Sequence, residues 1–192
     1  MSHRFALDRS HRLDAPEREA WQKPDAVVDA LDLRIGDCVV EVGSGTGYFT
    51  SRIARATGAK GRVIAVDAQE RMLDALRARC EKEELDNVDL FAAPGENTTI
   101  QADTANLVFL ANVAHEFDDL AAALSEATRM LRRDGRVAVL DWVDEKTEVG
   151  PPLDHRLSET DLRLAADAAG LRPMATHTFL PHHYYVVFER TP

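Results

Sequence analysis

The sequence has no long apolar run and very little cysteine. Nowhere do about 18 apolar residues follow one another, so no segment is predicted to span a membrane. Residues 1–22 are polar and charged and lack the apolar core of a signal peptide. The two cysteines, Cys38 and Cys80, provide no disulfide or metal-binding framework and suit a reducing compartment. We therefore expect a cytoplasmic protein with no membrane partner and no metal site.

Positive charge is also scarce. The chain has 23 Lys and Arg against 33 Asp and Glu, which gives a formal net charge of −10. The cations are scattered and form no basic stripe, whereas affinity for nucleic acids depends mainly on cationic contacts to phosphates. This composition disfavours a nucleic acid as partner and favours a small molecule. No metal site is predicted for the dispersed histidines of the C-terminal part, which are His155, His177, His182 and His183.

Apolar runs rich in β-branched residues alternate with amphipathic helical patterns from residue 35 onward. This alternation predicts parallel strands joined by right-handed crossovers and buried on both faces. The predicted strands are Cys38–Val42, Arg62–Val66, Val88–Phe91, Asn106–Leu110 and Arg136–Asp141. The predicted helices between them are Tyr48–Thr57, Gln69–Glu83 and Leu120–Leu131, the last with Asp118 as its N-cap and Asp134-Gly135 in the turn that follows.

The C-terminal part follows a different pattern. A helix is predicted over Ser158–Ala169, with Ser158 as its N-cap. The strands Arg172–Phe179 and His183–Glu189 are separated by three residues, too few for a crossover helix, so the last strand must run antiparallel to its neighbour. The predicted fold is a three-layer α/β/α sandwich around a Rossmann-like, seven-stranded sheet with the last strand antiparallel. A length of 192 residues suits a single domain.

The most informative stretch is a glycine-rich turn, VVEVGSGTGYFT, at residues 39–50. Gly43, Gly45 and Gly47 follow a buried strand, at the edge where open α/β sheets bind ligands. A dinucleotide fingerprint, G-x-G-x-x-G, would require glycine at position 48, where the chain has Tyr48. Glu41 lies two residues before the turn and would attract a cationic group but repel a pyrophosphate. The turn therefore predicts a ligand with a positive charge rather than a dinucleotide.

A second acidic residue, Asp67, ends the next predicted strand, 20 residues after Gly47. A carboxylate at this position can accept both hydroxyls of a ribose. The alternative is that Asp67 caps the following helix, and one residue can do both. Because a ribose occurs in several cofactors, Asp67 does not discriminate among them.

Four segments in order resemble class I S-adenosylmethionine-dependent methyltransferases, and within them the compact bacterial enzymes related to quinone and arsenite methyltransferases. The segments are EVGSGTGYFT, VIAVDAQERML, LVFLANVAHEF and LRRDGRVAVLDW. The resemblance implies that residues 35–142 form the cofactor-binding core, 143–192 the substrate-side portion, and 1–34 an arm and helix that act either as a lid, with Trp21 and Lys23, or as a contact in a homodimer.

The resemblance also implies a set of residues that bind S-adenosyl-L-methionine. Gly43, Ser44 and Gly45 would offer backbone to the methionine part, and Asp67 would hold the ribose. Met72 would pack near the adenine, unless it is simply helix core. The family often has G-D-A-E after the third strand, and this chain has A-P-G-E, which leaves the adenine amino group to Gly95 or Glu96. The full predicted set is Glu41, Gly43, Ser44, Gly45, Gly47, Asp67, Ala68, Met72, Gly95, Glu96 and Leu110, the last beside the transferable methyl group.

The catalytic candidates follow the fourth and fifth strands. His115 has an ordinary pKa near operating pH and could take a proton from an acceptor. Its alternative is to cap or pack the following helix. Glu116 is its neighbour, and Asp141 ends the fifth strand, where Trp142 either lines a pocket or belongs to the core. We take His115, Glu116 and Asp141 as the catalytic set.

The sequence therefore predicts methyl transfer to a small acceptor such as a phenol, a quinone-like ring or a thiol. Arsenite is disfavoured, because such enzymes use additional cysteines. Two alternatives stay open. One is a non-catalytic or regulatory protein that binds S-adenosylmethionine. The other is an NAD-dependent oxidoreductase, weakened by Tyr48 and by the lack of a Tyr-x-x-x-Lys pair.

Overall fold

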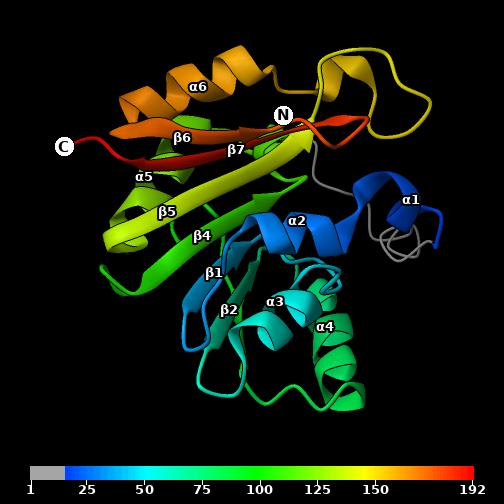
Figure 1. Ribbon diagram of the computed structural model, residues 1–192, viewed down its shortest axis with the longest axis vertical. Helices are drawn as coiled ribbons and strands as arrows, with labels where there is room; N and C mark the ends of the chain where they lie inside the picture. Colours follow the sequence, from blue (N-terminus) through cyan, green and yellow to red (C-terminus); the bar gives the residue numbers. More distant parts are fainter. Residues whose placement is uncertain (1–15) are drawn as a thin grey trace.

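A seven-stranded sheet forms the middle of the protein in the computed structural model, which describes residues 16–192 (Figure 1). The strand order is β3-β2-β1-β4-β5-β7-β6. Neighbours among the first five strands in this order pair in parallel. Strand β7 runs antiparallel to both β5 and β6, as the short connection predicted. The strands are β1 (Cys38–Val42), β2 (Arg62–Asp67), β3 (Val88–Ala92), β4 (Ala105–Ala111), β5 (Leu131–Trp142), β6 (Leu171–His177) and β7 (His183–Arg190).

Helices cover both faces of the sheet, so the three-layer sandwich is confirmed (Figure 1). The helices are α1 (Arg18–Gln22), α2 (Pro24–Ala30), α3 (Thr50–Thr57), α4 (Glu70–Lys82), α5 (Leu120–Met130) and α6 (Glu159–Ala168), with short 3₁₀ turns η2 (Ala114–Glu116) and η3 (Leu153–His155). Alternate residues of each strand point to opposite faces of the sheet and contribute to two hydrophobic cores. Val40 and Val108 pack toward α5 and α6, whereas Val39 and Phe109 pack toward α2 and α3.

Two details differ from the predictions. The N-cap of α5 is Asp119, whose carboxylate accepts the Ala122 N–H at 2.9 Å, and not Asp118. Strand β5 begins at Leu131 rather than Arg136. The predicted Asp134-Gly135 turn lies within this longer strand, at the point where its register shifts opposite Ala105 and Leu107. Ser158 does cap α6, accepting the Asp161 N–H at 3.0 Å.

The N-terminal segment is described only in part. Residues 1–15 of the predicted arm lie outside the described residues. Helix α1 and helix α2 follow, and α2 begins at Pro24, whose fixed φ suits the first position of a helix. Within residues 16–192, no helix is both long and apolar enough to cross a bilayer.

Gly47 fixes how closely the glycine turn approaches α4. Its φ is +88°, and a Cβ there would lie 2.3 Å from Leu76 Cδ1. Gly47→Ala should therefore lower the free energy of unfolding by about 2–4 kcal/mol, combining backbone strain with overpacking. The matched control is Gly36→Ala, which has φ +94° with open space around it and should cost only about 1–2 kcal/mol. Equal losses in chemical denaturation would show that Gly47 is not a packing position.

Candidate functional site

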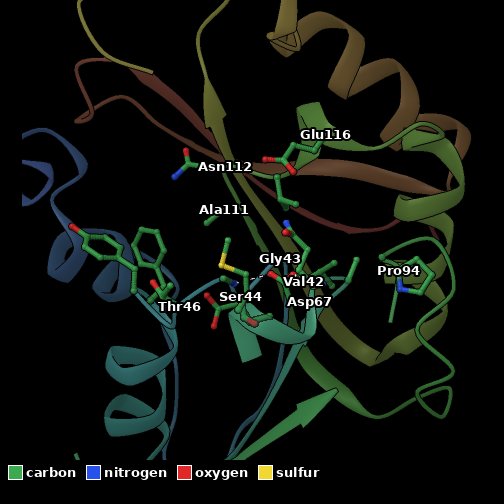
Figure 2. A pocket seen from close by; sticks show the side chains of 18 of the residues that line it. Val42, Gly43, Ser44, Thr46, Asp67, Pro94, Ala111, Asn112 and Glu116 are labelled. Carbon is green, nitrogen blue, oxygen red and sulfur yellow. Dashed lines mark hydrogen bonds between the residues drawn. The ribbon is translucent and has the colours of Figure 1, made fainter. Parts of the chain in front are cut away.

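A pocket opens at the carboxyl ends of β1, β2 and β4 (Figure 2). Nine of the predicted cofactor-binding residues line it, namely Glu41, Gly43, Ser44, Gly45, Asp67, Ala68, Met72, Gly95 and Glu96. Of the predicted catalytic residues only Glu116 lines it.

The glycine turn uses its own N–H groups to hold itself to β2. The N–H groups of Gly43 and Ser44 both donate to the Val66 carbonyl, at 2.8 and 3.0 Å. The Gly45 N–H donates to Asp67 Oδ2 at 2.9 Å. A pyrophosphate site needs such donors free to face the phosphate oxygens. With these three N–H groups committed inside the protein, the turn is not built as an anion cradle.

The buried acid Glu41 lies below this turn. Its side chain accepts the Thr50 hydroxyl at 2.6 Å, and the residue is only 3% exposed. Burial raises the pKa of Glu41 to about 8, with Thr50 opposing the shift and the Asp67 carboxylate adding to it. A buried carboxyl of this kind is nearly neutral until a cation arrives, and then it favours the cation strongly.

Asp67 holds the turn as well as facing the pocket. Its Oδ2 accepts the Gly45 N–H, and its Oδ1 accepts the Gln69 N–H at 2.9 Å. The N-cap residue of α4 is Gln69 itself, so Asp67 is not the capping residue that we considered as its alternative role. Each carboxylate oxygen can accept more than one hydrogen bond, so Asp67 can hold the turn and still bind hydroxyls.

The opposite wall is apolar. Met72 is 2% exposed and lines the pocket, so it is at once helix core and pocket wall. Gly95 allows a close approach there, because a Cβ would lie 2.5 Å from the ring of Phe117. Ala68 and Pro94 line the pocket as well.

Two predicted cofactor residues point elsewhere. Leu110 is 1% exposed and packs in the core beneath α5, so its side chain faces away from the pocket, and the next residues, Ala111 and Asn112, line it instead. The error follows from strand alternation, in which a shift of one residue reverses the face. Gly47 does not line the pocket either, since it packs against Leu76.

His115 and Asp141 form a buried pair beside the pocket. The Asp141 carboxylate accepts the backbone N–H groups of His115, at 3.0 Å, and of Trp142, at 2.8 Å. It also contacts the ring Nδ1 of His115 at 2.7 Å. Burial disfavours the imidazolium, but the charge and hydrogen bond of Asp141 outweigh burial and raise the pKa of His115. Neither residue lines the pocket, whereas Glu116, one residue on, does. The predicted catalytic set is therefore adjacent in space but only partly within the pocket.

Several lining residues were missed by sequence reasoning. In the sequence, Tyr48 served only to exclude a glycine at that position. In the structure it lines the pocket, and the Arg18 guanidinium lies 4.0 Å from the centre of its ring. Arg18 could not be found, because its place depends on how α1 folds back over the sheet. Phe49 and Val113 flank predicted motifs and could have been included on that ground.

Comparisons with known proteins agree with this geometry. Residues 39–135 match the model of a methyltransferase domain family, and the chain belongs to that family. It is 34% identical over 137 residues to a ubiquinone/menaquinone biosynthesis C-methyltransferase of Rhizobium johnstonii, covering 70% of this chain and 51% of the relative. It is 26% identical over 132 residues to a demethylmenaquinone methyltransferase of Bacillus cereus, covering 69% and 54%. The chain thus spans about half the length of these curated relatives.

The fold is also similar to solved structures. A SAM-dependent methyltransferase from Aquifex aeolicus superposes with a TM-score of 0.92 at 26% identity, covering 96% of this chain and 98% of that one. These findings confirm the class that the four sequence segments indicated, and they give no support to an oxidoreductase.

Proposed function

We propose that this protein transfers the methyl group of S-adenosyl-L-methionine to a small-molecule acceptor. The observation that carries the proposal is the pairing of a buried acid, Glu41, with a glycine turn whose N–H groups are committed elsewhere. This arrangement suits the cationic methionine end of the cofactor and not a pyrophosphate. In this proposal Asp67 accepts the ribose hydroxyls, and Met72 and Gly95, which also line the pocket, lie beside the adenine.

Held by Glu41 and Asp67, the cofactor would supply the electrophilic methyl group of its sulfonium to an electron pair of the acceptor, and its sulfur would keep the electrons of the broken bond. Within this scheme Glu41 and Asp67 bind and orient, which is most of what an in-line displacement needs. His115 receives the acceptor's proton on its Nε2, since its Nδ1 is held by Asp141.

The chemical class that we propose for the acceptor rests partly on the relatives. Both curated relatives are named as methyltransferases of quinones or of quinone biosynthesis, and we propose a ring-shaped acceptor of this kind for the present chain. The free cysteines Cys38 and Cys80 fit the cytoplasm, and the acidic composition disfavours a nucleic-acid substrate.

The test is a methyl-transfer assay that follows S-adenosylhomocysteine release across a library of phenols, quinols and thiols. We expect turnover with at least one ring acceptor. A protein that binds the cofactor but releases no product with any compound would instead be the non-catalytic binding protein.

Cofactor affinity should depend on pH through Glu41. Because the pKa of Glu41 is raised to about 8, the empty site holds a proton at neutral pH, and a bound ammonium displaces it. Affinity for S-adenosylhomocysteine should then rise about tenfold per pH unit between about pH 6 and 7, with one proton released. Calorimetry in buffers of different ionisation enthalpy measures both quantities.

Glu41→Gln should abolish this pH dependence and leave the affinity weak throughout. The matched control is Glu126→Gln, which removes a buried carboxyl remote from the pocket, whose pKa is lowered to about 2, chiefly by its hydrogen bond from Arg129. This control should keep the slope of the parent. A flat profile in the parent protein would mean that Glu41 does not meet the ammonium.

A further inference from the structure

In the part of the chain that the structure describes, four buried side-chain atoms near helix α1 have no hydrogen-bond partner. They are Gln22 Nε2, Asn112 Oδ1 and both ring nitrogens of His183. Gln22 is fully buried, and His183 is 3% exposed. Each buried polar atom left unpaired costs about 1–3 kcal/mol, so native proteins keep few of them without a reason. A group of four points to something that these atoms bind.

Helix α1 brings these side chains together. The Gln22 Oε1 accepts the Asn112 Nδ2 at 3.2 Å, which ties α1 to the end of β4. The preceding residue of α1, Trp21, stacks on His183 with ring centroids 5.7 Å apart and planes within 8°. Trp142 also contacts the imidazole, with ring centroids 4.1 Å apart, and the two indoles contact each other at 5.3 Å. An amide pair and an imidazole thus lie next to α1, and two adjacent indoles pack against the imidazole.

The cluster adjoins the cofactor pocket. Asn112 lines that pocket, and Figure 2 shows it above Ser44 and Asp67, at the same end as Glu116. Its own N–H donates to the Leu140 carbonyl at 2.8 Å, two residues before Trp142 on β5. Asn112 is therefore the link between the proposed cofactor site and the aromatic cluster of Trp21, Trp142 and His183.

We propose that His183 and the Gln22–Asn112 amide pair form the recognition site for the methyl acceptor, and that they select an uncharged, flat molecule bearing hydroxyl or carbonyl groups. This inference rests on the proposed methyl transfer. The three side chains together offer both donors and acceptors, and the indoles of Trp21 and Trp142 offer apolar faces.

The charges at the cluster support an uncharged ligand. Burial lowers the pKa of His183 to about 3, so its imidazole is neutral, with one donor and one acceptor nitrogen. Arg18 and Arg156 are cations near the cluster, and both already have partners. Arg18 donates to Gln22 Oε1 at 3.2 Å and lies over the Tyr48 ring. Arg156, over the Trp142 ring, donates to the Val143 and Glu145 carbonyls at 3.0 and 2.7 Å. A carboxylate or phosphate would have to be buried here without a dedicated cationic partner, which is costly.

The chain provides its own reporter for this site. Its two tryptophans, Trp21 and Trp142, both contact His183, so the intrinsic tryptophan emission arises entirely at the proposed acceptor site. The experiment saturates the protein with S-adenosylhomocysteine and titrates in hydroquinone and catechol as uncharged probes, with benzoate as the anionic comparison. Tryptophan emission, corrected for probe absorbance, gives each dissociation constant.

His183→Phe is the test variant, because it keeps an aromatic ring in contact with both indoles and removes the two ring nitrogens. The matched control is His177→Phe, a half-buried histidine of β6 whose ring contacts Tyr185 at 4.8 Å, away from α1. We expect His183→Phe to weaken a phenol probe about tenfold while S-adenosylhomocysteine affinity is unchanged. His177→Phe should bind both ligands as the parent does.

The outcomes separate the two levels of the proposal. A parent protein that fails to bind S-adenosylhomocysteine overturns the proposed function itself. If the cofactor product binds but neither phenol does, the cluster holds only water and the inference is wrong. Equal phenol binding by His183→Phe and the parent, or tighter binding of benzoate than of the phenols, also overturns it.

Discussion

Asp67→Ala should weaken S-adenosylhomocysteine binding by roughly 10- to 150-fold. The substitution removes a charged acceptor proposed for two ribose hydroxyls, and such bonds contribute about 1.5–3 kcal/mol, with water replacing part of the loss. The structure adds a second reason, since Asp67 also accepts the N–H groups of Gly45 and Gln69 and so holds the turn in place. Calorimetry on the parent and the variant measures the change.

Turnover at saturating cofactor should fall much less than affinity. Asp67 acts far from the sulfonium, so its loss removes an interaction that is equally strong in the ground state and in the transition state. Asp67→Asn should be milder, since its amide oxygen still accepts. A suitable control is Asp37→Ala, which removes a carboxylate that accepts a backbone N–H, from Arg34 at 2.8 Å, away from the pocket. Unchanged affinity in Asp67→Ala would mean that the ribose is held elsewhere.

His115→Ala should lower turnover by about 10²- to 10⁴-fold, the usual contribution of a positioned acid or base. Its affinity for S-adenosylhomocysteine should stay close to that of the parent, because His115 does not line the cofactor pocket. His182→Ala, at a half-buried histidine on the turn before β7, is the control and should leave the rate unchanged. The rate is measured with the acceptor that the library screen identifies.

The pH profile distinguishes a base from a packing residue. Only the neutral imidazole can take a proton, so the rate should rise with pH, with a midpoint above the ordinary value of 6.5, because Asp141 raises the pKa of His115. Asp141→Asn removes that charge, so the midpoint should move to lower pH. The raised pKa of His115 in the parent also affects stability. The His115–Asp141 pair stabilises the fold fully below about pH 6.5, and this contribution decreases as pH rises through the raised pKa. A rate unaffected by either substitution would return His115 to a packing role.

Most of the framework could be predicted from local patterns. The alternation of strands and helices gave the sheet, and the three-residue link before His183 required the antiparallel last strand. The glycine spacing with Glu41 and Asp67 located the pocket, because these residues end adjacent parallel strands.

The rest depends on tertiary packing. The phase of β4 decides that Leu110 faces the core and Ala111 the pocket, and the sequence does not fix that phase, since Leu107 to Leu110 are apolar without interruption. The positions of Arg18 and Gln22 depend on where α1 docks, which no local pattern encodes. The proximity of Trp21 to His183 joins residues at opposite ends of the chain and could only be seen in the fold.

The central claim is that this pocket binds a sulfonium nucleoside and not a dinucleotide. Isothermal calorimetry of the purified protein with S-adenosylmethionine and with NAD⁺, under identical conditions, tests it most directly. Binding of S-adenosylmethionine at one site per chain, undiminished by added NAD⁺, is the predicted result, and tighter binding of NAD⁺ would contradict it.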